Sequence, residues 1–133
     1  MSKRNVELVH GAHDAFNRRD LEAFVEFAAP EVEITPLTVE LEGVTSYHGH
    51  GGIRSWWKDL LTVFPDFRTE IDEVRDLGDV TLARARLRGH GVESDAFFER
   101  PIWQVVEWRD EKAVWWRAFL SEAEALEAAS LRQ

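Results

Sequence analysis

The sequence predicts an α+β domain in which helices pack against one face of a curved, mostly antiparallel sheet. Residues 49–64 repeat apolar side chains at helical spacing, and two further helical stretches precede them. Residues 67–120 contain four alternating or apolar segments joined by short polar turns, which indicates strands. Strands joined by short connections pair antiparallel, so helices beside such a sheet define the α+β class.

Two helices and a strand are predicted first. An apolar stripe in residues 5–20 predicts the first helix. Asp20 is the predicted N-cap of a second helix, which Pro30 closes. The segment 31–37 follows as a short strand, and a polar loop at 38–46 leads onward.

The remaining elements follow in a regular order. The helix at 49–64 is the clearest in the chain, because its apolar residues recur at i, i+3, i+4, i+7 and i+8. Ser121 and Glu124 form an S-x-x-E capping box that opens a closing helix over 121–131. Between these helices we predict four strands, at residues 67–72, 80–89, 96–108 and 113–120.

Length and composition narrow the function. The 133 residues are predicted to form one domain, 1–133, large enough for a core without metal or disulfides. There is no cysteine, which excludes thiolate nucleophiles and disulfide scaffolds. A formal charge of −9 disfavours nucleic acid as a partner. No apolar run is close to the length needed to span a bilayer. We therefore expect a cytoplasmic protein that does not bind a membrane. No cofactor motif is present, and none is predicted.

Three segments together resemble a known family. Residues 6–27, 47–57 and 109–131 are similar to the SnoaL-like group of the nuclear transport factor two-like superfamily. This resemblance implies a cone-shaped sheet wrapped around the N-terminal helices, with a deep apolar pocket and, in many members, a homodimer. The family includes ketosteroid isomerase, limonene epoxide hydrolase, scytalone dehydratase and polyketide cyclases. The family's usual D-G-K turn reads Asp110-Glu111-Lys112 here, so we expect this hairpin to turn differently.

The family's best-known acids are missing from the matching positions. The resemblance puts Ala12 at the hydrogen-bonding tyrosine of ketosteroid isomerase, Thr35 at its general base and Trp103 at its protonated aspartate. It puts Ala118 at an acid of limonene epoxide hydrolase. Both reactions need a carboxyl group with a shifted pKa in an apolar site, and these residues cannot supply one.

The segment 113–121, AVWWRAFLS, is apolar on both faces if it forms a strand. The resemblance implies that the face of Trp116, Ala118 and Leu120 looks into the pocket. Large apolar side chains on the opposite face would then be exposed to solvent, which monomers seldom tolerate. We therefore predict a homodimer interface at Trp115, Arg117 and Phe119; the alternative is that a helix or loop of the same chain covers them.

Tryptophans and other apolar residues from several elements are predicted to converge on one pocket for a small hydrophobic or aromatic molecule. The alternative is that this aromatic stripe is plain core. The predicted lining consists of Ala12, Thr35, Trp56, Trp57, Phe64, Trp103, Val105, Trp116, Ala118 and Leu120.

Arginines alternate with small apolar residues in the segment 83–88. If Arg84, Arg86 and Arg88 face inward they form an anion-binding cluster; if outward, they solvate the back of the sheet. The outward arrangement is favoured, since three buried guanidinium groups would need several carboxylates. Arg86, in mid-strand, is the candidate for steadying an oxyanion.

The histidines offer proton-transfer candidates. His10 and His13, at i and i+3, could share a metal, but no metal site is predicted because surface histidines are common on helices. His48 and His50 are interpreted as exposed turn residues. His90 is the best acid/base candidate, because it lies in a glycine-containing loop near Glu93, Asp95 and Glu99, with His13 as the second.

The leading hypothesis is a small-ligand-binding protein, with cofactor-free lyase, isomerase or cyclase chemistry at His13 or His90 as an extension. The rival is a non-catalytic ligand carrier or dimeric interaction module. A hydrogen-bonded histidine or carboxyl group inside an enclosed pocket would favour the enzyme, and an all-aromatic, collapsed cavity would favour the rival.

Overall fold

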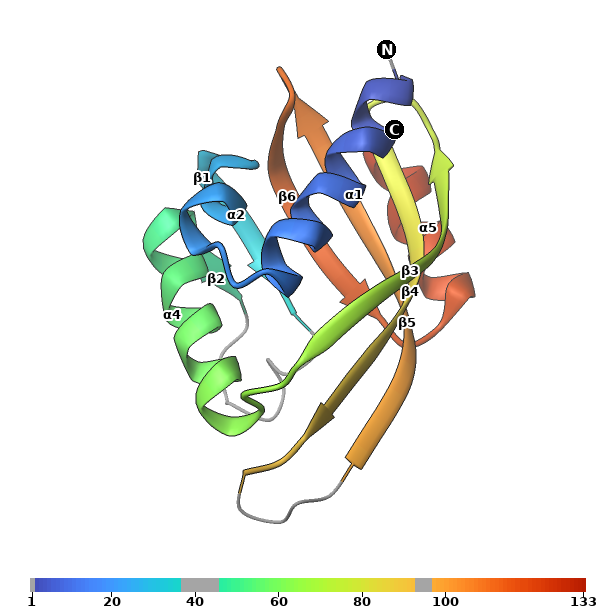
Figure 1. Ribbon diagram of the computed structural model, residues 1–133. Coiled ribbons are helices and arrows are strands. Elements are labelled where there is room, and N and C mark those ends of the chain that lie inside the picture. Colours follow the sequence, from blue (N-terminus) through green and yellow to red (C-terminus); the bar gives the residue numbers. More distant parts are fainter. Residues whose placement is uncertain (1, 37–45, 93–96) are drawn as a thin grey trace.

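The structure, a computed structural model, describes residues 2–36, 46–92 and 97–133 (Figure 1). Residues 38–45 of the predicted loop at 38–46, together with Glu93 and Asp95, lie outside the described residues. No helix in the described ranges is long and apolar enough to cross a membrane. The elements are α1 (Ser2–Asn17), α2 (Leu21–Glu26), β1 (Ala28–Thr35), β2 (Tyr47–His48), α4 (Gly49–Val63), β3 (Arg68–Asp76), β4 (Val80–His90), β5 (Phe97–Arg109), β6 (Lys112–Phe119) and α5 (Glu122–Arg132).

The strands form one six-stranded sheet in the order β2-β1-β6-β5-β4-β3. Each neighbouring pair is antiparallel except β1 and β6, which are parallel and are separated in the chain by helix α4 and four strands. The predicted α+β class and the mostly antiparallel sheet are confirmed.

The sheet curves strongly around the N-terminal helices. Its register shifts in three strand pairs, between Ala28 and Glu33 in β1, between Ile71 and Glu73 in β3, and between Glu107 and Trp108 in β5. Such bulges increase local twist and bend the strand that carries them. Helices α1, α2 and α4 occupy the concave side that results (Figure 1).

The second helix begins as predicted but ends early. Asp20 is its N-cap, and the Asp20 carboxylate accepts a hydrogen bond from the Ala23 N–H at 3.2 Å. The helix ends at Glu26, before Pro30, because the chain enters β1 at Ala28. Its last turn is fixed by the neighbouring strand, since the Phe27 carbonyl accepts a hydrogen bond from the β6 backbone at 2.8 Å.

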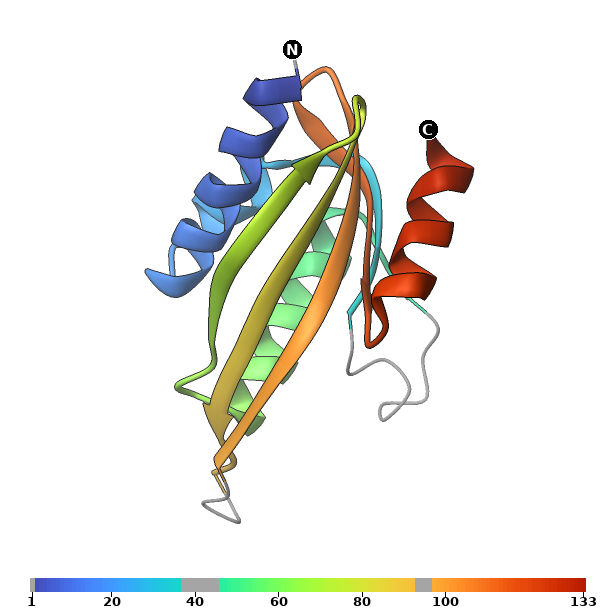
Figure 2. The same cartoon turned by 90° about the vertical axis from the view of Figure 1, so that its right-hand side faces the viewer.

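Helix α5 covers the outer, convex side of the sheet, opposite α1 (Figure 2). Its predicted N-cap is confirmed, since Ser121 Oγ accepts a hydrogen bond from the Glu124 N–H at 3.4 Å. The prediction that all the helices lie on one face is therefore wrong.

The same helix corrects the predicted dimer interface. Trp115 and Phe119 are only 9% and 8% exposed within the single chain, because they pack under Ala125 and Ala129 of α5. The Arg132 guanidinium lies 3.7 Å from the centre of the Trp115 ring, a close cation–π contact. The alternative weighed for these residues, a covering helix of the same chain, is what the structure shows, so no partner subunit is needed to bury them.

The β5–β6 hairpin turns at Asp110 and Glu111, which have φ of 52° and 64°. Two successive residues with positive φ are the signature of a type I′ turn, which matches the twist of paired strands. A glutamate therefore holds a backbone conformation that favours glycine.

Candidate ligand cavity

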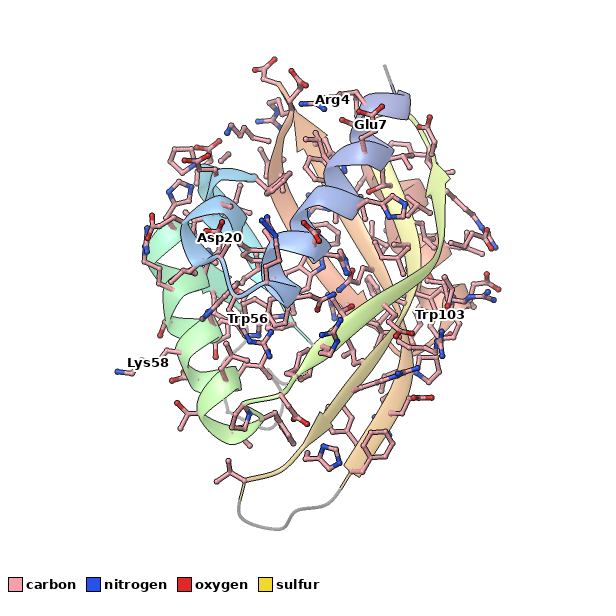
Figure 3. The ribbon with its side chains drawn as sticks, viewed as in Figure 1. Arg4, Glu7, Asp20, Trp56, Lys58 and Trp103 are labelled. Carbon is pink, nitrogen blue, oxygen red and sulfur yellow. The ribbon has the colours of Figure 1, made fainter. Side chains whose placement is uncertain are left out.

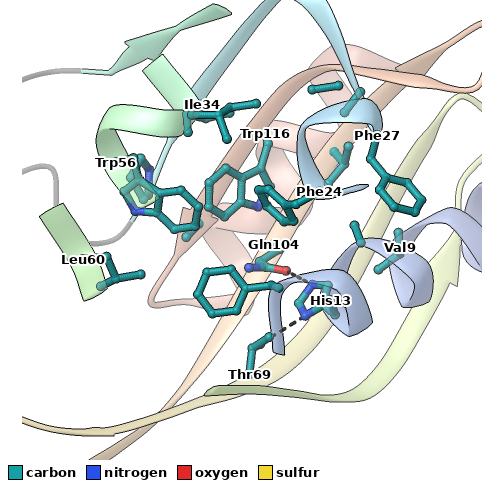
Figure 4. Close-up of a pocket in the computed structure, with 18 of the residues that line it drawn as sticks. Val9, His13, Phe24, Phe27, Ile34, Trp56, Leu60, Thr69, Gln104 and Trp116 are labelled. Atoms are coloured by element: carbon teal, nitrogen blue, oxygen red, sulfur yellow. Dashed lines mark hydrogen bonds between the residues drawn. The ribbon is translucent and has the colours of Figure 1, made fainter. Parts of the chain in front are cut away.

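A cavity of about 160 Å³ lies between the N-terminal helices and the concave face of the sheet (Figure 4). Every helix on this side contributes to it, as do strands β1, β3, β4, β5 and β6. Its wall is mostly aromatic and contains Phe16, Phe24, Phe27, Trp56, Phe64, Phe67, Phe98, Trp108 and Trp116.

The aromatic rings of the wall pack against one another, with half of their pairs edge to face and half tilted. The ring centres of Trp56 and Trp116 lie 5.4 Å apart at 63°, which joins α4 to β6 across the cavity. Phe64 and Phe98 lie 5.0 Å apart at 65° at the other end of α4. Such pairs add about 0.5–1.5 kcal/mol each beyond the area they bury. The rigid rings are thus held by one another, and the small residues Ala12 and Ala118 beside them leave the space open.

One polar cluster interrupts this wall. His13 of α1 lies between β3 and β5, with its Nδ1 3.1 Å from Thr69 Oγ1 and its Nε2 2.8 Å from Gln104 Oε1 (Figure 4). All three side chains line the cavity. Thr69 and Gln104 are only 6% and 7% exposed, so this cluster is polar chemistry placed inside an apolar core.

The cluster is fixed from behind by Asn17. Its side-chain amide donates to the Thr69 carbonyl at 2.8 Å, and its Oδ1 accepts the Thr69 N–H at 3.1 Å. This pair of bonds holds the start of β3 against the end of α1. The Thr69 hydroxyl is thereby kept facing His13.

Burial lowers the pKa of His13 from 6.5 to about 4. The hydrogen bond to Gln104 opposes this change, and the charge of nearby His10 reinforces it. Desolvation disfavours a charged imidazolium, so His13 is neutral at neutral pH. Part of its surface remains accessible because the ring borders the cavity. Among the described lining residues, His13 is the only titratable side chain.

Six residues predicted for the site from sequence lie in the cavity wall. They come from α1, α4 and β6 and include one proton-transfer candidate and five apolar residues: His13, Ala12, Trp56, Phe64, Trp116 and Ala118.

Two predicted pocket residues lie just behind the wall. Trp57 is buried in the core, where its ring lies 4.9 Å from Phe16 and 5.3 Å from Phe24. Thr35 follows the lining residue Ile34 on β1, and alternation turns its side chain to the opposite face. Neither borders the cavity, so both predictions are corrected.

Three others lie on the wrong side of the sheet or at its end. Trp103 and Val105 belong to the outer cluster beneath α5, and Figure 3 shows Trp103 on the side away from Trp56. Their inward neighbours on β5 are Ile102 and Gln104. Leu120 follows the last residue of β6 and is 54% exposed. The prediction for β5 was one residue out of register, which reverses the face.

Arg86 is likewise outside the cavity. With Arg84 and Arg88 it lies on the outer face of β4, as the alternation favoured. Its guanidinium pairs with Asp72 at 3.1 Å and with Glu70 at 3.1 Å. The candidate role of Arg86 in steadying an oxyanion inside the pocket is therefore wrong.

His90 has an acid partner, but at the surface. Its Nδ1 lies 2.6 Å from Asp66 Oδ2, and its backbone N–H donates to Asp66 Oδ1 at 2.8 Å. These bonds lower the pKa of Asp66. Glu99 pairs with Arg88 instead. His90 is exposed and does not line the cavity, so its role as a base inside the pocket is corrected.

Gln104 is the polar residue that sequence reasoning missed. It lies in PIWQVVEW, where both faces of the strand are apolar because α5 covers one and the cavity the other. Alternation therefore gave no preferred face. Thr69 carried a clearer signal, since it lies on the same, apolar face of its strand as Phe67 and Ile71.

Comparison with known protein families identifies the family to which this fold and cavity belong. The SnoaL-like domain family matches residues 9–122, so the chain belongs to this family. A comparison with the curated proteins finds no match.

Solved structures share the fold across nearly the whole chain. An NTF2-like protein of unknown function from Burkholderia pseudomallei has a TM-score of 0.80 at 22% identity, covering 93% of this chain and 95% of its own. TerC, co-crystallised with polyporic acid, has a TM-score of 0.80 at 19% identity, covering 96% and 98%. IdmH from Streptomyces antibioticus, a proposed polyketide cyclase, has a TM-score of 0.75 at 23% identity, covering 95% and 97%.

Proposed function

We propose that this protein binds one small, mainly aromatic molecule in the cavity between its helices and sheet. The observation that carries the proposal is the open volume of about 160 Å³ in a wall of nine aromatic rings. An apolar cavity of roughly 150 Å³ stays dry and can bind benzene. A single ring with small substituents therefore suits the volume, and rings in the wall offer it edge-to-face contacts.

The relatives are consistent with a small-molecule site in this fold. TerC was crystallised with polyporic acid, and IdmH is a proposed polyketide cyclase. Both share the fold with this chain at low identity, so they support a small organic ligand and leave its chemistry to the cavity's own residues.

Cofactor-free acid/base chemistry at His13 is the second candidate function. A hydrogen-bonded histidine in the pocket is the feature that the sequence analysis took to favour an enzyme over a carrier. With its pKa lowered to about 4, His13 accepts a proton rather than donates one at neutral pH, and it is a weak base. The lining described here contains no second titratable group that could return the proton. Binding is therefore the better supported function.

A cavity-filling variant tests the binding proposal. We expect fluorobenzene to bind the wild-type protein saturably, as measured by line broadening in ¹⁹F NMR. Ala118→Leu places extra methyl groups in the cavity wall, so we expect its affinity to fall at least about tenfold. Ala128→Leu on α5 is the matched control, because Ala128 packs with the outer cluster. Absence of binding to the wild type, or equal binding by Ala118→Leu, would contradict the proposal.

A further inference from the structure

The hydrogen bonds of the polar cluster fix which group faces the cavity. Gln104 Oε1 can only accept, so the His13 Nε2 beside it carries the proton. His13 Nδ1 is then the acceptor, and the Thr69 hydroxyl donates to it. Both ring nitrogens of His13 are thus occupied by the protein.

This arrangement leaves the Gln104 amide nitrogen free. Within the described residues, Gln104 Nε2 has no hydrogen-bond partner, and Figure 4 shows the amide turned so that its oxygen faces His13 and its nitrogen lies on the opposite side. The side chain borders the cavity although the residue is only 7% exposed. The unpartnered amide nitrogen is therefore accessible from the cavity, where an acceptor on a ligand can form a hydrogen bond with it.

The other free polar groups in the wall are also donors. Trp56 and Trp116 line the cavity, and in the described part of the chain their indole N–H groups have no partner. An indole nitrogen can donate but cannot accept. Gln104 on β5 therefore gives the cavity a free N–H group, and the two indole N–H groups are further unpaired donors on residues of its wall.

The wall is also without charge. The described lining contains no Asp, Glu, Lys or Arg, and His13 is held as the neutral imidazole between its two partners. An ion buried here would have no opposite charge beside it, which is strongly unfavourable.

We propose that the cavity selects uncharged aromatic molecules with a carbonyl oxygen, and that the Gln104 amide donates a hydrogen bond to this oxygen. The proposal rests on the binding function above and adds the ligand's chemical class. The aromatic ring packs against the Trp56–Trp116 pair on the cavity side, and the carbonyl faces β5. Gln104 becomes the residue that determines specificity.

Two ligands of similar shape test this. Acetophenone carries a carbonyl where cumene carries a methyl group, so cumene reports apolar binding alone. Gln104→Met keeps the length of the side chain and removes its amide. We expect this variant to weaken acetophenone about tenfold and to leave cumene within about twofold, measured by calorimetry or NMR titration. The two proteins and the two ligands then form a thermodynamic cycle, which isolates the interaction between the Gln104 amide and the ligand carbonyl.

A measurement on the wild type covers the case in which Gln104→Met fails to fold. In ¹H–¹⁵N correlation spectra, acetophenone should shift the side-chain amide proton signals of Gln104 downfield, and cumene should not. Benzoate, the charged analogue, should bind at least about tenfold more weakly than acetophenone.

Each outcome has a distinct meaning. If Gln104→Met weakens both ligands by the same factor, or benzoate binds as tightly as acetophenone, the carbonyl proposal is overturned and the binding function stands. If the wild type binds neither acetophenone nor cumene, the binding function itself fails.

Discussion

Trp115 and Trp116 are adjacent in sequence and lie in opposite environments. Trp115 faces the convex side, where α5 brings Ala125 and Ala129 close to the sheet and the cluster is filled. Trp116 faces the concave side, where three helices carry large rings that surround an open space. Small residues on a covering helix close one face, whereas rigid rings on several helices keep the other open. The convex side is thus closed, and the concave side holds the cavity that we propose for the ligand.

Truncating the two tryptophans should separate stability from binding. Trp115→Ala removes a buried ring from the packed cluster beneath α5, so we expect a loss of about 3–5 kcal/mol in the free energy of unfolding. Trp116 is half-buried and already borders the cavity, so Trp116→Ala should cost about 1–2 kcal/mol. Urea unfolding measures both.

Binding should show the reverse order. We expect Trp116→Ala to weaken fluorobenzene severalfold and Trp115→Ala, where it is folded, to leave the affinity within about twofold. Equal effects of the two substitutions on stability and on binding would remove the distinction between the faces.

Acid should destabilise the concave side through His13. The pKa of His13 falls from 6.5 to about 4 on folding, so the unfolded chain binds the proton more tightly. The stability is therefore fully present above pH 6.5 and is lost as the pH falls toward 4. At ~1.4 kcal/mol per unit of pKa, the full contribution is about 3 kcal/mol, of which about 2 kcal/mol is lost by pH 5.

Unfolding free energies at pH 7 and pH 5 check this prediction. His13→Gln should remove most of the pH dependence in this range. His10→Gln, one turn away on α1 and exposed, should reduce it only slightly, because the His10 charge is the smallest cause of the lowered His13 pKa. A His13→Gln protein with the wild-type pH dependence would show that His13 is not the responsible group.

Arg86 should matter least. Its ion pairs with Asp72 and Glu70 are partly exposed, and such pairs contribute about 0–1 kcal/mol. Arg86→Met should therefore change the free energy of unfolding by less than about 1 kcal/mol and leave fluorobenzene binding unaltered. A loss of binding greater than about threefold would return Arg86 to the site.

The sequence predicted elements with one apolar face well. In β4 the alternation of Ala83, Ala85 and Leu87 with three arginines has a single physical solution, and the arginines lie outward as it favoured. Local polar groups also identified two helix starts, at Asp20 and Ser121.

Strands with two apolar faces could not be oriented from sequence. Trp103 and Gln104 of β5 exchange roles if the register moves by one residue, and only the pairing of Gln104 with Ala118 on β6 decides between them. The cover of Trp115 was equally hidden, because α5 has exposed leucines at 126 and 131 and buries alanines instead. The polar cluster unites residues from α1, β3 and β5, separated by as many as 91 positions, so no local motif announces it.

The indole N–H signals of the tryptophans provide the most direct test of the binding cavity. The chain has six tryptophans, and single Trp→Phe substitutions would assign their ¹H–¹⁵N resonances. On titration with fluorobenzene we expect saturable shifts for Trp56 and Trp116 and none for Trp103 and Trp115. Shifts confined to Trp103 and Trp115, or no saturable shift at any tryptophan, would contradict a ligand cavity on the concave side.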